Sequence, residues 1–273
     1  MRSSNDPSYL LLDSRKSSDI FITFYIPNLN EKNAIVPTCE KLRKVSNEIG
    51  ITYELLIVDD NSNDNSVAVI HDYLTANLTI KNWKIIENRE RRGIGFNYGT
   101  AAELGHGKFI CMVCADNSET YESLVKMISA VQKNEVSKNY GGVVPNFRNN
   151  DSRTLPRRIT SKVFVRLCKV MSGLKYSYFN GPTIHRRKNV ARFKPQSSGY
   201  AFQAELLCTL TYLGYQFTEV TIGNHDREEG KSRAFNFKNL VSVSHSLLQI
   251  LFMRIRNFFW PSSNAVDWDD SEE

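Results

Sequence analysis

Carboxylate side chains follow two apolar runs of this chain, at positions where they could bind a cation or the polar part of a nucleotide. Asp59 and Asp60 directly follow the run Leu55–Val58, and Asp116 comes just after a second run at Phe109–Cys114. Apolar runs of this length are typical of strands that are buried on both faces of a parallel sheet. Because ligands of such sheets bind at the carboxyl ends of the strands, we expect Asp60 and Asp116 to meet around one ligand.

The chemistry of these side chains predicts the class of ligand. Hard carboxylate oxygens suit Mg²⁺ or Mn²⁺, and such a cation commonly bridges the phosphates of a bound nucleotide. A metal ion on a departing diphosphate stabilises the charge that grows there as the bond breaks. Asp116 taken alone could equally cap a helix or end in an exposed loop, but the two clusters together favour a functional site.

Strand-like and helix-like segments alternate along the first half of the chain. This alternation predicts an α/β fold with a mostly parallel sheet that is flanked by helices on both faces. The pattern becomes less regular after Pro145, so we expect the second half to carry the specialised part. The expected strands are residues 20–26, 55–58, 83–87, 109–114 and 141–145.

Composition limits the partners and the compartment. The formal charge of +6 favours phosphates, nucleotides or anionic lipid, although it could also serve solubility alone. The basic residues lack the interleaved aromatics of nucleic-acid-binding modules, so no nucleic acid is expected. The five cysteines, an odd number with mostly apolar neighbours, are expected to be reduced, buried thiols of a cytosolic protein. Neither a signal peptide nor a run of about 20 apolar residues is visible, so no membrane span is expected.

Changes in composition along the chain predict its division into parts. Polar residues dominate the start, acidic residues dominate the end, and an amphipathic segment precedes the acidic end. The expected parts are a flexible leader (1–18), one large domain (19–235), an amphipathic helix (236–261) and an acidic, disordered tail (262–273).

Two amphipathic helices are predicted in the second half. Arg158, Lys162 and Arg166 have the spacing that places them on one face of a helix, with apolar residues on another face. That basic face could simply be solvated, or it could bind an anionic membrane or a phosphate. The second helix, at Phe237–Trp260, is heavily apolar but interrupted by Arg254, so we expect it to lie on a bilayer or dock on protein rather than cross.

Seven short motifs, each weak alone, are specific as a set. They are IPNLNE (26–31), VDDNSNDNS (58–66), RRGIGFNYGTA (91–101), CADNSE (114–119), NGPTIHRR (180–187), GYAFQAELL (199–207) and GKSRAF (230–235). The first four resemble the glycosyltransferase family 2 domain, which has the GT-A nucleotide-sugar-binding fold. The last three extend the resemblance to polyprenyl-phosphate sugar transferases of the dolichol-phosphate mannosyltransferase type, over about residues 19–260.

The resemblance implies a nucleoside diphosphate sugar as donor and Mg²⁺ or Mn²⁺ as cofactor. Asp116 matches the last Asp of the family's Asp-x-Asp metal motif and is therefore the implied metal ligand. Cys114 replaces the first Asp of that motif, so Asn117, Ser118 or water would complete the coordination. The residues implied to bind the nucleotide sugar are Pro27, Asn30, Glu31, Asp59, Asp60, Gly93, Asp116 and Lys231.

The implied reaction is inverting transfer of the sugar to a polyprenyl phosphate, undecaprenyl or dolichyl, by a protein peripheral on the cytoplasmic face of a membrane. That acceptor is already an anionic nucleophile, so positioning and charge compensation suffice. Arg148 and Arg233 match basic positions near the donor and acceptor phosphates, and with Asp116 they are the implied catalytic residues. A membrane subunit or a second copy of the chain could be a further partner. The basic residues available to the acceptor phosphate or the membrane are Arg158, Lys162, Arg166 and Arg233.

Two alternatives stay open on the sequence, and a third is disfavoured. A transferase that extends a glycan hydroxyl would need a carboxylate base, for which Glu205 is the candidate, unless it is an ordinary helix residue. A non-catalytic, nucleotide-sugar-binding subunit would also be consistent with Cys114 in the metal motif. A dehydrogenase is disfavoured, because the glycines at 93 and 95 follow the acidic strand end, whereas a dinucleotide-binding turn should precede it.

Overall fold

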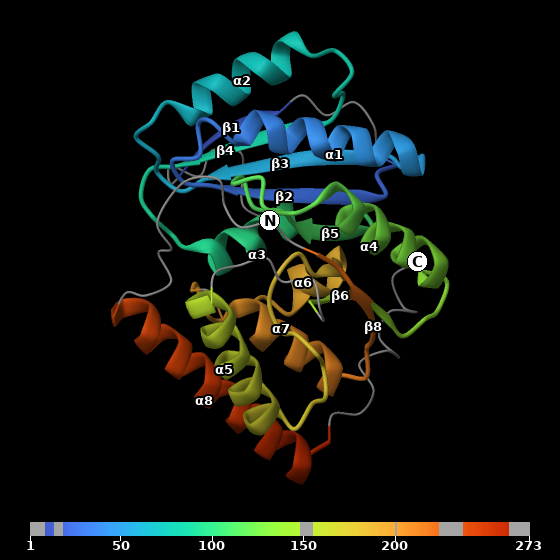
Figure 1. Cartoon of the computed structure of the whole chain (residues 1–273), viewed down its shortest axis with the longest axis vertical. Helices are drawn as coiled ribbons and strands as arrows, with labels where there is room; N and C mark the ends of the chain where they lie inside the picture. The colour runs from blue at the N-terminus through green and yellow to red at the C-terminus, as the bar shows by residue number, and fades with distance from the viewer. Residues whose placement is uncertain (1–8, 14–18, 148–154, 200, 224–236, 262–273) are drawn as a thin grey trace.

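The computed structural model describes residues 9–13, 19–147, 155–199, 201–223 and 237–261 (Figure 1). Within these residues, eight strands form one sheet flanked by eight helices. The strands are β1 (Tyr9–Asp13), β2 (Ile22–Asn28), β3 (Tyr53–Asp59), β4 (Trp83–Asn88), β5 (Phe109–Met112), β6 (Tyr140–Asn146), β7 (Ile184–Arg186) and β8 (Gln216–Thr221). The helices are α1 (Ile35–Ile49), α2 (Ser66–Ala76), α3 (Ile94–Leu104), α4 (Tyr121–Asn134), α5 (Leu155–Ser172), α6 (Arg187–Arg192), α7 (Phe202–Tyr212) and α8 (Phe237–Phe259).

The centre of the sheet is parallel, as the alternating pattern predicts. The strand order is β1-β4-β3-β2-β5-β7-β6-β8, and β4, β3, β2 and β5 run in one direction. β7 runs against both of its neighbours, so the sheet is mixed at that point. The sequence does not reveal β7, because a three-residue strand is too short to show a hydrophobic period.

One correction concerns the leader at residues 1–18, which the sequence predicts to be flexible. Residues 9–13 form β1, which pairs antiparallel with β4 from Tyr9 opposite Asn88 to Asp13 opposite Lys84. The buried ammonium of Lys84 lies 3.4 Å from the Asp13 carboxylate. The rest of the leader and the predicted disordered tail lie outside the described residues.

Two apolar clusters cover the two faces of the sheet. Alternation along β2 sends Phe24 to the cluster beneath α1, α2 and α4, and sends Tyr25 to the cluster beneath α3, α6 and α7. The fold is therefore a sheet between two helical layers. All five cysteines are free thiols, and only Cys114 is not fully buried.

A third apolar cluster joins α5, α7 and α8 to β6 of the sheet, whose Val144 is buried in it. Cys168 of α5, Leu207 of α7 and Ile250 of α8 are among its buried members. Figure 1 shows α5 and α8 side by side at one end of the molecule, with α2 at the other end. The helix predicted at Phe237–Trp260 is thus α8, and one of its faces belongs to the protein core.

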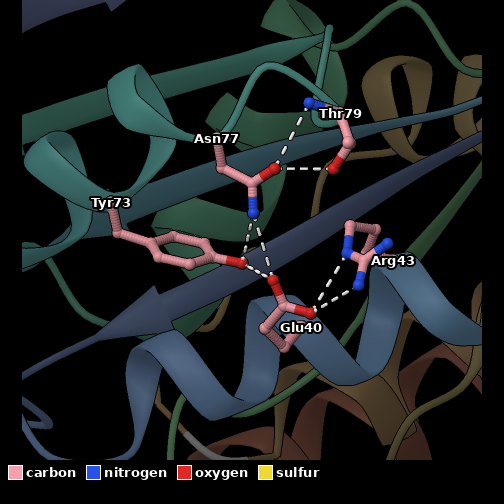
Figure 2. Close-up of polar contacts among 5 residues, drawn as sticks. All are labelled: Glu40, Arg43, Tyr73, Asn77 and Thr79. Atoms are coloured by element: carbon pink, nitrogen blue, oxygen red, sulfur yellow. Dashed lines mark hydrogen bonds and ion pairs between the residues drawn. The ribbon is translucent and has the colours of Figure 1, made fainter.

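A polar cluster fastens α2 to α1 on the outer surface of the helical layer (Figure 2). The Glu40 carboxylate accepts two hydrogen bonds from the Arg43 guanidinium, at 3.1 and 2.8 Å. Its other oxygen accepts from the Tyr73 hydroxyl and from the Asn77 amide, the latter at 3.1 Å. Asn77 Oδ1 in turn accepts from Thr79, which fixes the chain where it leaves α2.

Removing the Glu40 carboxylate should therefore loosen the contact between these helices. We expect Glu40→Ala to lower the free energy of unfolding by about 1–3 kcal/mol, because the Tyr73 hydroxyl and the Asn77 amide lose their shared acceptor. Urea unfolding followed by circular dichroism measures the change. Glu48→Ala is the control, since this exposed acid of α1 bonds only at the surface, to Tyr121. An equal loss of unfolding free energy in the two variants would show that the Glu40 cluster stabilises the protein no more than a surface hydrogen bond does.

Candidate functional site

Asp59 ties the ends of two neighbouring strands to the turn that follows. It is buried, and its Oδ1 accepts a hydrogen bond of 2.6 Å from the Asn28 amide at the end of β2. Its Oδ2 accepts from the Ser62 backbone N–H at 2.9 Å, while the Ser62 hydroxyl donates to Oδ1. Both oxygens thus have protein partners, and Asp59 shapes the turn in the structure. Its predicted contact with the nucleotide stays a prediction.

Hydrogen bonds join the loop after β2 to the same turn. Asn30, in the left-handed conformation at φ 58°, accepts from the Asn63 backbone N–H at 2.8 Å. Its own N–H donates to the Ser62 hydroxyl at 2.9 Å. Pro27 lies opposite Val58 within the sheet. The carbonyl of Glu31 accepts the N–H of Ala34 and of Ile35 at the start of α1. The structure thus gathers the predicted residues Pro27, Asn30, Glu31 and Asp59 at the ends of β2 and β3.

Asp60 fixes the loop between β4 and α3. Its Oδ1 accepts from the Arg92 backbone N–H and the Asn97 amide, both at 2.9 Å, and from the Asn88 amide at 3.1 Å. Its Oδ2 accepts from the Gly93 backbone N–H at 3.1 Å. Sequence reasoning names Asp60 and Gly93 separately, and the structure brings them into direct contact.

The glycines of this loop allow a very close approach by the second half of the chain. The Gly95 N–H donates to the Ser198 carbonyl at 3.0 Å. A Cβ atom on Gly93 would lie 2.7 Å from the Ser198 carbonyl oxygen, and one on Gly95 would lie 2.1 Å from that of Ser197. The glycines are therefore needed for contact between the start of α3 and the Ser197 loop.

Glu205 holds the other side of this contact. It is buried on α7, and its two carboxylate oxygens accept from the backbone N–H groups of Gln196 and Ser197, at 2.7 and 3.1 Å. Burial raises the pKa of this carboxyl, and the two N–H groups oppose that effect. Hydrogen bonds and close packing therefore lead from Asp60 through the glycine loop to Glu205. A role of Glu205 as general base stays a prediction.

The loop after β5 carries the predicted metal ligand. Asp116 accepts from the Ser118 backbone N–H at 3.2 Å, and Asn117 is left-handed at φ 60°. Lys41 of α1 donates to the carbonyl oxygens of Asn117 and Glu119, at 3.1 and 2.5 Å. These contacts fix the loop backbone from the α1 side and leave Asp116 partly exposed.

Glu119 is a member of this loop that sequence reasoning does not single out. Its Oε2 is buried, as is Asn117 Oδ1, and neither has a hydrogen-bond partner among the described residues. Burial, with the nearby charge of Asp116, raises the pKa of Glu119 to about 7. The sequence could have drawn attention to Glu119, because it is the last residue of the CADNSE motif. The motif does not, however, indicate that its side chain is buried.

Asp60 and Asp116 follow strands that flank β2 on its two sides. β3 and β5 both run parallel to β2, so both acids follow the carboxyl ends of parallel strands, and these two strands are about 10 Å apart. Burial first and then the charges of Asp60 and Cys114 raise the pKa of the Tyr25 hydroxyl, which donates to the Ile94 carbonyl at 3.3 Å. That both acids face one ligand position stays a prediction.

The donor set partly fits a divalent cation. The described residues contain no group of three His, Cys, Asp or Glu side chains that could hold a metal ion. Magnesium, however, is usually bound through one or two carboxylates together with substrate phosphates and water. Asp116, with the unpartnered oxygens of Asn117 and Glu119 beside it, fits a cation that is shared with a diphosphate.

The predicted basic residues lie elsewhere or outside the described part. Arg148, Lys231 and Arg233 lie outside the described residues. Arg158 and Lys162 are exposed on α5, as is Arg166 one turn further, and this helix packs against α8. Among the described helices, none has the length and apolar character required to cross a bilayer.

Comparison with known proteins adds the family. The model for "Glycosyl transferase family 2" matches residues 23–196. A dolichyl-phosphate β-glucosyltransferase of Dictyostelium discoideum is 23% identical over 261 residues, which covers 89% of this chain and 77% of that protein. A UDP-glucose:α-D-GlcNAc-diphosphoundecaprenol β-1,3-glucosyltransferase of Escherichia coli is 23% identical over 154 residues, 56% of this chain and 58% of that protein.

Solved structures confirm the predicted GT-A fold. Mannosyl-3-phosphoglycerate synthase of Rubrobacter xylanophilus has a TM-score of 0.60 at 15% identity, covering 89% of this chain and 76% of that chain. Glucosyl-3-phosphoglycerate synthase of Mycobacterium tuberculosis, solved with Mn²⁺ and UDP, has a TM-score of 0.58 at 16% identity, covering 86% and 80%.

The contact between the glycine loop and the Ser197 loop can be tested by one methyl group. We expect Gly95→Ala to lower the free energy of unfolding by about 1–3 kcal/mol, because the new Cβ would collide with the Ser197 carbonyl. Gly99→Ala is the matched control on the same helix, since its Cβ would meet only the Lys194 side chain, at 3.7 Å. Thermal and urea unfolding of both variants give the comparison. A Gly95→Ala protein as stable as Gly99→Ala would contradict the close contact.

Proposed function

Because this chain belongs to glycosyl transferase family 2, we propose that it transfers a sugar from a nucleoside diphosphate sugar to a polyprenyl phosphate at the cytoplasmic face of a membrane. The observation that carries the proposal is the pair of acids, Asp60 and Asp116, at the ends of two parallel strands that flank β2. Family membership makes the chain a glycosyltransferase and favours it over a non-catalytic sugar-nucleotide-binding subunit.

The donor would lie over the ends of β2, β3 and β5. The Asp60 carboxylate holds the Gly93 loop rigid, and the Asn28–Asp59 bond holds the neighbouring strand ends, so the protein surface facing the nucleotide is preorganised. Preorganised groups cost little reorganisation when the ligand binds. Pro27, in β2 beside these ends, and Lys231 would complete the nucleotide contacts.

The divalent cation, Mg²⁺ or Mn²⁺, would neutralise charge on the departing diphosphate when bound. In this chain Asp116 would hold it jointly with the donor phosphates. Lys41 keeps the 117–119 backbone in place behind Asp116. Arg148 and Arg233 are proposed to add positive charge beside the donor and acceptor phosphates.

The proposed step is a direct displacement with inversion. An oxygen of the acceptor phosphate forms a bond to C1 of the sugar while the bond from C1 to the diphosphate oxygen breaks. The electron pair of the broken bond leaves with the nucleoside diphosphate. Because the acceptor oxygen already carries negative charge, no proton has to be removed. The name of the Dictyostelium relative, a dolichyl-phosphate β-glucosyltransferase, supports this class of acceptor.

A second candidate is transfer to a sugar hydroxyl on a lipid-linked glycan. The name of the Escherichia coli relative, which acts on α-D-GlcNAc-diphosphoundecaprenol, favours it. A hydroxyl acceptor requires a general base, and Glu205 is the buried carboxylate available for that role. The two carboxylate oxygens are already committed to the Gln196 and Ser197 amides, which makes the phosphate acceptor the better-supported proposal.

The reaction can be tested by extracting labelled lipid. The protein is incubated with labelled UDP-, GDP- or other nucleotide sugars, with undecaprenyl or dolichyl phosphate, and with or without Mn²⁺. We expect butanol-extractable product, and a loss of about 100-fold or more with Asp116→Asn. Asp72→Asn, the same change at an exposed acid of α2, serves as the control. A nucleotide that stabilises the protein thermally while no acceptor is ever glycosylated would sink the enzyme proposal.

The role of Glu205 separates the two acceptors. If it only holds the 196–197 loop, Glu205→Gln should raise the KM for the donor, with the shape of the pH–rate profile unchanged. If it is a base, kcat should fall about 10²–10⁴-fold and the acidic limb of the profile should disappear. Steady-state rates between pH 5 and 9 distinguish these results, with the exposed Glu103→Gln of α3 as the control.

A further inference from the structure

Exposed apolar side chains gather on two neighbouring helices. Among the described residues, the large apolar side chains that stay exposed lie on α5, on α8 or at Trp260 directly after α8, apart from Leu78 and Val136. Isolated exposed apolar residues are normal on a protein surface, but a concentration on one pair of helices marks an interaction surface.

α5 has two apolar faces. Cys168 is fully buried in the third apolar cluster, and Phe164 and Val165 pack against the same cluster. A second row recurs at helical spacing on the outside, where Ile159 and Val163 are each 53% exposed. The first face explains how the helix docks on the protein, and the second has no function in the core. The second row is Leu155, Ile159, Val163, Leu167 and Val170.

α8 repeats this arrangement. Leu247 and Ile250 are buried in the same cluster, so removing the whole helix would open the core as well as any outer surface. The other side carries an exposed row at helical spacing that ends in an aromatic group. This row is Leu248, Phe252, Ile255, Phe258, Phe259 and Trp260.

The two helices are joined into one preformed surface. The Arg254 side chain of α8 donates a hydrogen bond of 2.8 Å from its Nη1 to the carbonyl oxygen of Val170 on α5. The guanidinium also packs on Gly173, where a Cβ would lie 3.1 Å from its Cζ. Figure 1 shows the helices side by side at the end of the molecule far from α2. We name this two-helix face, defined by the two exposed rows above, the α5–α8 surface.

The charge of this surface selects its partner. Neither α5 nor α8 contains an Asp or a Glu, whereas Arg158, Lys162, Arg166 and Lys169 are all exposed along α5. An apolar surface with such a basic border would repel a second copy of itself across a two-fold interface. The α5–α8 surface instead matches a bilayer with anionic headgroups. Such a bilayer accepts apolar side chains beneath its headgroups and attracts cations to its surface.

We propose that the α5–α8 surface docks on an anionic lipid bilayer through both helices together. The apolar rows enter the boundary between headgroups and acyl chains, and the basic residues of α5 contact the headgroups. The aromatic end of α8, Phe258, Phe259 and Trp260, has the residue types found on the apolar face of helices that lie in a membrane interface. The inference deepens the proposed function, which requires a lipid acceptor, by naming the surface and the class of lipid that bring the protein to it.

The test uses the full chain and vesicles, without donor or acceptor. Flotation is compared between vesicles of phosphatidylcholine alone and vesicles with 40% phosphatidylglycerol, at 50 and 500 mM NaCl. We expect binding to the anionic vesicles that weakens at high salt. Lys162→Glu/Arg166→Glu should weaken the partition coefficient by at least about 25-fold, since each basic residue near an anionic surface is worth roughly fivefold.

Matched controls distinguish binding through the α5–α8 surface from non-specific effects of net charge and of exposed apolar residues. Lys126→Glu/Lys133→Glu reverses two exposed lysines on α4, and should change the partition coefficient by less than about threefold. Phe252→Ser/Ile255→Ser should weaken binding about tenfold or more, whereas Leu78→Ser/Val136→Ser, two exposed apolar residues elsewhere, should not. All positions are exposed, and circular dichroism confirms that each variant is folded.

Three outcomes would overturn the proposal. Equal binding to both kinds of vesicle, or none, would exclude recognition of anionic lipid. An equal loss with the α4 control would assign the effect to net charge. A dimer that light scattering detects and that Phe252→Ser/Ile255→Ser dissociates would assign the surface to a second copy. Because no sugar transfer is measured, vesicle binding can succeed while the proposed reaction fails, and the reverse.

Discussion

The Asp60 carboxylate is the acceptor for four N–H groups that come from three places in the chain. It bonds to backbone amides of the β4–α3 loop, to Asn88 at the end of β4 and to Asn97 within α3. Without it, these donors would lose their shared acceptor, and each one left unsatisfied would cost about 1–3 kcal/mol. The glycine loop would then lose the shape that meets the Ser197 loop, and with it the tie to Glu205. A change at Asp60 would therefore alter folding, whatever its effect on the proposed nucleotide binding.

Much of this arrangement is predictable from local sequence. Continuous apolar runs predict parallel buried strands, and β2, β3, β4 and β5 are parallel in the structure. The rule that ligands bind at the strand ends then places Asp60 and Asp116 on one edge. Family resemblance adds the GT-A fold, which solved structures support. Strong periodic signals and a topological rule suffice for these features because both are local or general.

Other features depend on contacts between segments far apart in the chain. Glu205 looks like a possible base because its type and helix position are visible, whereas its bonds to Gln196 and Ser197 require the folded loop. The Gly93 and Gly95 pair looks like a phosphate-binding turn, but its neighbours are the carbonyls of Ser198 and Ser197. Similarly, periodicity finds the apolar rows of α5 but cannot tell which row the core covers.

The pairing of β1 with β4 also decides how the molecule behaves in concentrated solution. β4 would otherwise end the parallel part of the sheet with a row of unpaired N–H and C=O groups, a template on which other chains can add strands. β1 (residues 9–13) pairs with these groups of β4. Its last residue, Asp13, forms an ion pair with Lys84 of β4. Trimming the chain back to the family domain would expose the unpaired edge of β4, so a shortened protein should aggregate even if its fold is otherwise intact.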